Sequence, residues 1–206
     1  MIDKSLREFN EMLASKQPVP GGGGASALAG ALAAGLAQMV ANLTIGKKKY
    51  AQSEEQMKQL LCSAESLQQE LLEGIQKDAD AFYPLSQAYG LSKDDPLREV
   101  TMESCLKKAA MVPFELLHSC AKVLDVLEEM LPISSTLAVS DIGTAATLAQ
   151  GALNGSAINV LVNTKLMKNR SYAELLNKQV MVMLDAYNHK ADLIFDNVME
   201  RMQKNG

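Results

Sequence analysis

The chain has 206 residues and a formal net charge of −4, and it contains no tryptophan. This length suits one domain with a full hydrophobic core, and a slightly acidic chain without a long basic block excludes the electrostatic pattern of a nucleic-acid-binding protein. Ala, Leu, Met, Gln, Lys and Glu dominate the composition, which favours helices. We therefore expect a single all-α domain over residues 1–206.

Cysteine usage and hydropathy indicate the compartment. Cys62, Cys105 and Cys120 lack the spacing of a metal site and are typical of small buried residues in a reducing compartment. The charged, amphipathic start of the chain is unlike a signal peptide. The run from Ala25 to Leu43 is long enough to span a bilayer, but it is mostly Ala and Gly and stands alone. We expect a buried core helix there, no membrane contact and a cytoplasmic protein.

Start and stop signals predict two helices in the first quarter of the chain. A short helix capped by Asp3 ends at the Pro/Gly loop of residues 17–24. A second helix runs from about Gly24 to Leu43, and Gly46 closes it. Because this second helix has no charge and little side-chain bulk, another helix can pack against it closely.

Two longer helices follow. The third begins at a capping box on Ser53 and runs to about Tyr89. The fourth follows a turn at residues 92–96 and runs to about Leu131, and Pro113 inside it should kink it.

Two further helices complete the chain. Ser140 caps the fifth, which runs to about Met167 and is apolar nearly all round, as expected of a buried helix. A capping box at Ser171 opens the last, which continues through Met202. The sequence thus predicts an up-and-down bundle of about six helices, several of them long and one kinked by a proline.

The loop PVPGGGG at residues 18–24 leads directly into the second helix. A glycine loop at a helix start gathers unpaired backbone N–H groups at the positive end of the helix dipole, where an anion or the polar edge of a ring can bind. The spacing is neither that of a phosphate loop nor that of a dinucleotide fold. A flexible entry to a tight helix–helix contact is therefore the alternative.

A carboxylate interrupts the apolar stripe of the third helix. The stripe follows steps of three and four residues: Leu60, Ala64, Leu67, Leu71, Ile75, Phe82, Leu85 and Tyr89. Asp78 fills the position missing from it, whereas Asp80 points to the opposite face. A core-facing carboxylate is costly unless it is paired or used, and burial is expected to raise its pKa, which suits a general acid or base. The alternative is a structural carboxylate that caps a neighbouring helix or pairs with a lysine.

Three further polar groups each have a structural and a functional interpretation. Lys47 and Lys48 follow the negative end of the second helix, where they complement its dipole or hold an anionic ligand tail. Asp141 lies in the first turn of the fifth helix, where a dipole partner is also expected. Asn159 and Asn163 lie one turn apart in an apolar helix, so their amides need partners in another helix, another subunit or a ligand ring.

Five segments in order, PVPGGGGASA, LTIGKKKY, KDADAF, AAMVPFELL and SDIGTAATLAQGALNGSAINVLVN, resemble the formiminotetrahydrofolate cyclodeaminase / methenyltetrahydrofolate cyclohydrolase family over nearly the whole chain. The resemblance implies an all-α up-and-down bundle that forms a homodimer. It also implies that a folate binds in a cleft near the glycine loop, close to the subunit interface. No metal and no cofactor beyond the tetrahydrofolate substrate are expected.

The resemblance also assigns roles to individual residues. Substrate binding falls on Pro20, Gly21, Gly22, Gly23, Lys47, Lys48, Ser140, Asn159 and Asn163. The acidic positions fall on Asp78 and Asp141, which we expect to divide the acid–base work and the stabilisation of a cationic intermediate. The chain departs from the family pattern at Gly24, where a serine is usual, and at His118, where an acidic residue can occur.

Two reactions at the same carbon fit this resemblance. In the cyclodeaminase reaction, the N10 atom of 5-formiminotetrahydrofolate attacks the formimino carbon, ammonia leaves and 5,10-methenyltetrahydrofolate forms. In the cyclohydrolase reaction, water attacks that carbon and 10-formyltetrahydrofolate forms. The sequence does not separate the two. An interpretation from another class is a non-catalytic helical dimer whose small-residue helices are only packing surfaces.

Overall fold

The computed structural model describes residues 1–204, which form six α-helices and two short 3-10 helices with no strand. The elements are α1 (Leu6–Leu13), α2 (Gly22–Asn42), η1 (Lys48–Ser53), α3 (Glu54–Ala88), α4 (Arg98–Met130), η2 (Thr136–Ala138), α5 (Val139–Leu166) and α6 (Arg170–Lys204). The prediction of an all-α chain of about six helices, several of them long, is confirmed.

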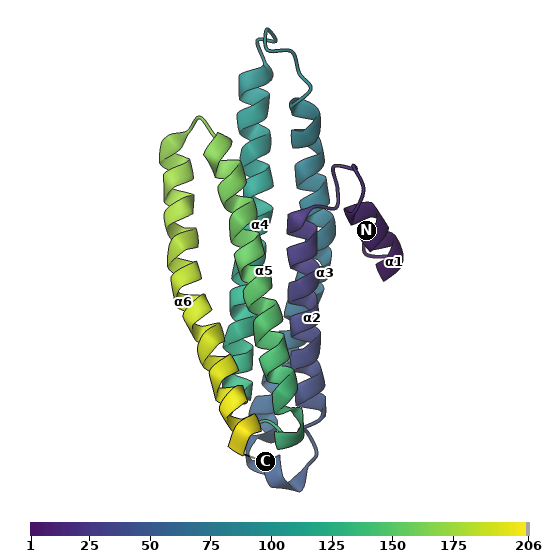
Figure 1. Cartoon of the computed structure of the whole chain (residues 1–206), viewed down its shortest axis with the longest axis vertical. Helices are drawn as coiled ribbons and strands as arrows, with labels where there is room; N and C mark the ends of the chain where they lie inside the picture. Colours follow the sequence, from purple (N-terminus) through teal and green to yellow (C-terminus); the bar gives the residue numbers. More distant parts are fainter. Residues whose placement is uncertain (205–206) are drawn as a thin grey trace.

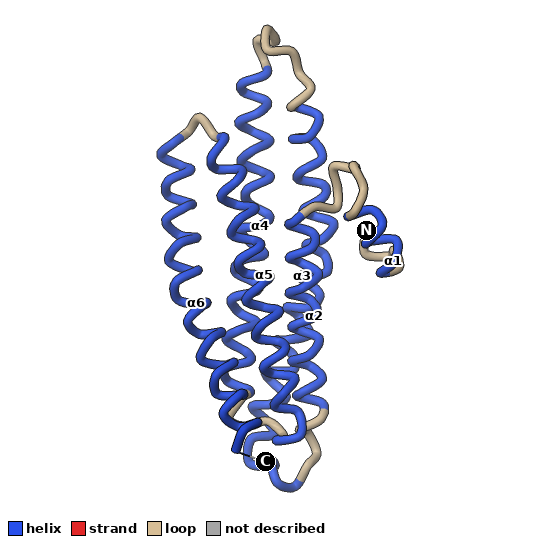
Figure 2. Tube along the Cα trace, in the orientation of Figure 1, coloured by secondary structure: helices blue, strands red, loops and turns tan. Residues whose placement is uncertain are grey.

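The five long helices run alternately down and up along one axis (Figures 1 and 2). Helices α2, α3, α4 and α5 close a four-helix bundle in which each packs against the next and α5 returns to α2. Helix α6 packs against α5 and α4 outside this bundle. Helices α3 and α4 project beyond the others at the upper end, and α1 lies at the side of α3 (Figure 1). The up-and-down topology is therefore also confirmed.

Two of the expected helix caps are wrong, in each case because another side chain reaches the free N–H groups first. Ser5 caps α1 instead of Asp3, since the Ser5 hydroxyl accepts from the Glu8 N–H and the Glu8 carboxylate accepts from the Ser5 N–H, which closes a capping box. Asn169 caps α6 instead of Ser171, because its side-chain oxygen accepts from the Tyr172 N–H (3.1 Å).

The two other expected caps are also absent. Helix α3 follows the 3-10 turn of η1, and Ser53 makes no side-chain cap hydrogen bond. Helix α5 begins at Val139, directly after η2, so that Ser140 lies inside the first turn. In both places a preceding helical turn supplies the backbone geometry that a cap would otherwise set.

Small residues let α2 lie deep between its neighbours. A Cβ at Gly30 would lie 3.0 Å from the Leu71 side chain and 3.1 Å from Cys120 Sγ, and a Cβ at Gly155 of α5 would collide with the Ser26 hydroxyl. Helix α2 is long and apolar enough to cross a membrane, but 56% of its apolar window is buried inside the bundle. The cytoplasmic location stays a prediction.

Prolines lie inside two of the long helices. Pro113 lies within α4, as expected, and Pro84 lies within α3. The kink at Pro113 stays a prediction.

Candidate active site

A small cavity lies where α2 begins, and all four helices of the bundle contribute to it. Its volume is about 120 Å³. The residues that line it are Pro18, Val19, Gly21, Gly22, Gly23, Asp78, Phe82, Ala109, Asn159, Val162 and Asn163. The cavity thus brings together the glycine loop, the core-facing carboxylate and the two asparagines that were singled out in the sequence.

Asp78 points from α3 at the glycine-rich start of α2. A Cβ at Gly23 would lie 2.6 Å from Asp78 Oδ2, so only glycine allows the carboxylate to come this close to the backbone. The Gly24 backbone N–H donates to this carboxylate, which lowers its pKa, but desolvation of the half-buried side chain is the larger effect and raises the pKa to about 6. None of the ion pairs within residues 1–204 involves Asp78. Its carboxyl group can therefore take up or release a proton near neutral pH.

The two asparagines of α5 form the opposite wall. Asn159 Nδ2 donates to the Gly155 carbonyl (2.8 Å), and Asn163 Nδ2 donates to the carbonyls of Ala109 (3.0 Å) and Asn159 (2.8 Å). A Cβ at Gly22 would lie 3.0 Å from Asn159 Nδ2, a tight contact that a small shift of the end of the Asn159 side chain would relieve. Backbone carbonyls thus use the amide N–H groups, and the amide oxygens accept no hydrogen bond within the described chain.

Pro20, also predicted to bind substrate, is buried in the loop before α2 and does not line the cavity. The remaining predicted site residues lie at the far end of the bundle. Lys47 Nζ donates to Ser135 Oγ (3.0 Å), Lys48 is exposed in η1, and Ser140 and Asp141 lie in the first turn of α5. Asp141 precedes Asn159 by 18 residues. This separation is five turns, or about 27 Å along the helix axis. Within one chain the structure does not bring these residues to the Asp78 cavity.

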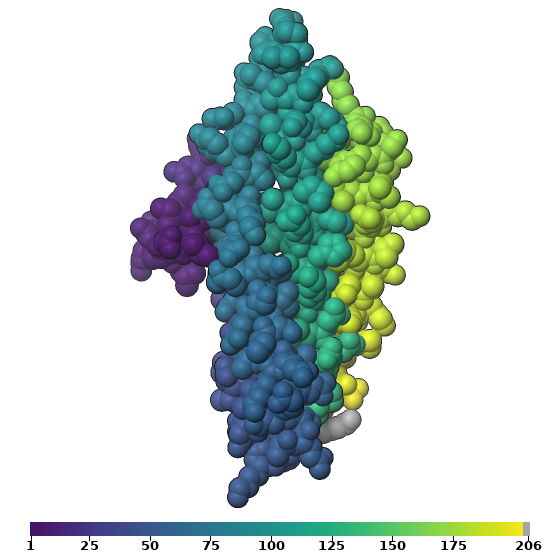
Figure 3. Space-filling model, turned by 180° about the vertical axis from the view of Figure 1, so that it is seen from behind, coloured from purple at the N-terminus to yellow at the C-terminus, as the bar shows by residue number. Residues whose placement is uncertain are grey.

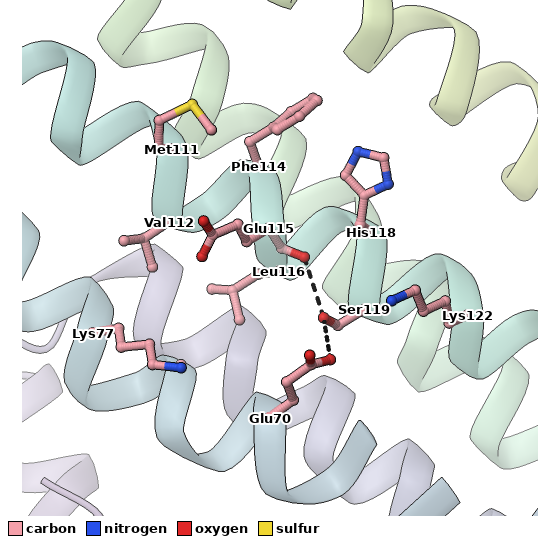
Figure 4. A pocket seen from close by; sticks show the side chains of 11 residues that line it. Glu70, Lys77, Met111, Val112, Phe114, Glu115, Leu116, His118, Ser119 and Lys122 are labelled. Atoms are coloured by element: carbon pink, nitrogen blue, oxygen red, sulfur yellow. Dashed lines mark hydrogen bonds between the residues drawn. The ribbon is translucent and has the colours of Figure 1, made fainter. Parts of the chain in front are cut away.

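A larger cavity of about 330 Å³ lies between α3 and α4, and Figure 4 shows its side chains. Glu70 and Glu115 line it together with Lys77 and Lys122, and the Ser119 hydroxyl donates to Glu70 Oε2 (3.1 Å). None of the predicted site residues lines it, and its carboxylates share the groove with lysines. We therefore take the smaller cavity, where a desolvated carboxylate meets the backbone N–H groups at the start of α2, as the candidate active site.

Sequence reasoning missed the apolar part of this site. Phe82 counted only as a core position of the α3 stripe, and Val19 and Val162 carried no signal of their own. The spacing of Val162, three residues after Asn159 on one helix face, was the available clue.

The fold and the cavity define the class of protein. It is an all-α bundle in which the glycine-rich start of one helix faces a desolvated carboxylate. Residues 5–182 match the family model described as Formiminotransferase-cyclodeaminase. The chain belongs to this family.

Proteins named for reactions on tetrahydrofolates are among those that this chain is similar to. The chain is 35% identical to the methenyltetrahydrofolate cyclohydrolase of Methylorubrum extorquens, over 97% of this chain and 98% of that one. It is 26% identical to the mouse formimidoyltransferase-cyclodeaminase, over 98% of this chain but only 38% of that longer protein. The crystal structure of formiminotetrahydrofolate cyclodeaminase from Thermotoga maritima matches with a TM-score of 0.83 at 28% identity and covers 98% of this chain and 97% of that one.

Proposed function

We propose that this protein is a one-carbon folate enzyme that converts 5-formiminotetrahydrofolate to 5,10-methenyltetrahydrofolate and ammonia. The observation that carries the proposal is the Asp78 carboxyl group, whose pKa burial raises to about 6 and which faces the bare backbone of Gly23. Family membership and the full-length match to a solved cyclodeaminase support it. No metal or further cofactor has a role in the proposed reaction.

The chemistry needs a base near the attacking nitrogen and an acid for the departing one. A carboxyl group with a pKa near 6 populates both protonation states near neutral pH, so Asp78 can remove the N10 proton and then return a proton to the leaving ammonia. The N–H groups at the start of α2 lie at the positive end of its dipole, where they suit the carbonyl edge of the pterin. The amide oxygens of Asn159 and Asn163 suit its N–H edge.

The second candidate is hydrolysis of 5,10-methenyltetrahydrofolate to 10-formyltetrahydrofolate. The match to the Methylorubrum extorquens cyclohydrolase, which spans nearly the full length of both chains, favours it. In that reaction Asp78 would take a proton from the attacking water, so both reactions place the same carboxylate at the same carbon.

Incubation of the purified protein with each substrate tests the proposal. The ultraviolet absorbance of the methenyl product rises with 5-formiminotetrahydrofolate if the protein is a cyclodeaminase, and the absorbance of added methenyltetrahydrofolate falls faster than without protein if it is a cyclohydrolase. If neither signal changes, and 5-formyltetrahydrofolate does not raise the melting temperature, both enzyme proposals fail. A non-catalytic helical dimer then becomes the better interpretation.

We also propose that the protein is a homodimer through the outer face of α2 and α5. No charged residue occurs from Gly22 to Asn42 or from Ile142 to Thr164. Large apolar side chains on this face are nevertheless exposed: Leu32, Met39, Leu43, Ile158 and Val162. An uncharged face with exposed apolar side chains is typical of a subunit interface.

A twofold axis near the middle of α5 would also bring the separated site residues together. Gly151 lies roughly midway between Asp141 and Asn159, it is exposed, and a Cβ added there meets no atom within 4 Å. If two α5 helices cross antiparallel at Gly151, Asp141 of the partner subunit comes to the level of Asn159. Lys47 and Lys48 of the partner subunit would follow at the same end, where they can hold the anionic tail of a folate.

Gly151→Leu tests this interface without a change inside the subunit. The open space at Gly151 admits a leucine, and leucine favours a helix more than glycine does, so the monomer should keep its fold. We expect sedimentation to show a dimer for the unchanged protein and a monomer for Gly151→Leu. A dimer that persists with the same stability would place the interface elsewhere.

A further inference from the structure

Val19 separates the candidate active site from a second hollow on the surface. Its side chain lines the inner cavity of about 120 Å³ beside Asp78. It also lines an outer groove of about 300 Å³ against α3, formed by Met1, Val19, Gln76, Ala79, Asp80, Tyr83 and Pro84. One half-buried valine is therefore a partition between the two spaces.

The inner cavity alone is too small for a folate. Pockets that enclose small-molecule ligands usually measure roughly 300–1,000 Å³. Asp78, Phe82, Ala109 and Asn163 of its wall belong to long helices that pack on each other along the bundle. A wall must move to admit the heterocycle, and the bundle helices are the costly ones to move.

The wall that carries Val19 is weakly attached. It belongs to a strap, which we define as α1 with residues 14–21, and Figure 3 shows its N-terminal part as a lobe on the side of the bundle. Phe9 is the single buried side chain of α1, and Pro20 is the single buried residue of 14–21. Leu6 is 67% exposed, and the Met1 amino group, which precedes the strap, donates to Gln76 Oε1 of α3 (2.7 Å). Within the described chain, the hydrogen bonds of residues 14–17 stay inside the strap. Segments with few buried contacts open at low free energy.

We propose that Val19 is a gate, and that the strap swings outward to let the flat heterocycle of the substrate pass from the outer groove into the Asp78 cavity. The identity of that substrate rests on the proposed function. The exposed Tyr83 and the Pro84 ring give the groove a flat apolar surface on which such a heterocycle can rest before entry.

Matched valine variants on two sides of the same cavity test this gate. Stopped-flow fluorescence would follow binding and release of 5-formyltetrahydrofolate by the unchanged protein, Val19→Ala and Val162→Ala. A gate sets the rates of entry and exit, so Val19→Ala should raise both by about fivefold and leave the equilibrium Kd within about twofold. Val162→Ala makes the same chemical change on the α5 wall, where the side chain lines the cavity and lies on the proposed dimer face, so any change in Kd should come from the release rate and the entry rate should stay unchanged.

A second variant acts on the attachment of the strap instead of on the partition. Phe9→Ala removes the buried anchor of α1, and it should also raise both rates together. Its circular dichroism and its melting transition, compared with those of the unchanged protein, show that the bundle is intact.

Three results would overturn the gate. The first is faster binding in Val162→Ala with unchanged rates in Val19→Ala, since the ligand would then enter from the α5 side. The second is weaker binding in Val19→Ala through faster release alone, since Val19 would then be an ordinary binding contact. The third needs no ligand: amide hydrogen exchange in residues 14–21 as slow as in the middle of α2. Failure of the unchanged protein to bind the analogue would instead count against the proposed folate function.

Discussion

A carboxylate lies near each end of the α2–α5 pair, but the two carboxylates have different environments. At the upper end, Asp78 is half-buried beside Gly23, and desolvation raises its pKa to about 6. At the lower end, Lys47 already donates to Ser135, and Asp141 lies in the first turn of α5. We therefore propose that the acid–base group lies at the upper end, and that in the proposed dimer the lower end of the partner subunit supplies charged side chains to the substrate.

The largest expected effect comes from the upper end. Asp78→Asn keeps the shape of the side chain but removes the proton-transfer group, so we expect kcat to fall by about 100- to 10,000-fold. Circular dichroism should show an unchanged helix content, and 5-formyltetrahydrofolate should still raise the melting temperature. Turnover within twofold of the unchanged protein would mean that the two ends do not differ in the way described.

Gly23→Ala disturbs the upper end by a steric clash. The added methyl group would overlap the Asp78 carboxyl group, which must then turn away from the α2 backbone. We expect a loss of about 1–3 kcal/mol in the free energy of unfolding, measured by urea denaturation, together with a loss of turnover.

The matched control for this loss is Gly21→Ala. A Cβ at Gly21 meets no atom within 4 Å, so its unfolding free energy should change little. Equal effects at the two glycines would show that backbone freedom, and not the approach of Asp78, explains the need for glycine.

Subunit mixing sharpens the comparison between the ends. If each site takes Asp78 from one subunit and Asp141 from the other, a refolded mixture of Asp78→Asn and Asp141→Asn chains contains mixed dimers with one intact site. Random pairing then restores about a quarter of the activity of the unchanged protein. A mixture as inactive as the separate variants would place both carboxylates in the same chain, whereas an Asp141→Asn variant that is active on its own would place Asp141 outside the site.

The smallest effect is a pH-dependent difference in stability. The pKa of Asp78 lies at about 6 in the folded protein against an ordinary value of 3.8, so folding disfavours its charged form. The unchanged protein therefore loses stability as the pH rises from about 4 to about 6, and the penalty persists above that range. Asp78→Asn should have the higher melting temperature at about pH 8, and the difference should disappear toward about pH 4.

Asp80→Asn is the control for this pH dependence. Asp80 is exposed two residues further along α3, where its carboxylate accepts a hydrogen bond from Gln76 (2.8 Å). Its replacement should change the melting temperature similarly at both pH values. A difference for Asp78→Asn that does not vary with pH would contradict the raised pKa.

Local patterns along the chain were sufficient to predict the helices and one candidate catalytic residue. Apolar residues at steps of three and four identify α3, and one polar residue at a core position of that stripe is visible as an exception without any coordinates. The caps were less predictable, because Asp3 and Ser5 are both acceptable N-caps and only the reach of Glu8 decides between them.

The amino-acid sequence by itself determined an all-helical chain, a glycine-rich helix start and a carboxylate turned toward the interior. Only the tertiary structure decided that Asp78 meets Gly23 across α2 and α3, and that Asp141 stands about 27 Å away from Asn159. The physical reason is that helix periodicity is local, whereas the pairing of helix ends depends on helix lengths and crossing positions. These quantities are set by the packing of small residues such as Gly30 and Gly155 against neighbouring helices.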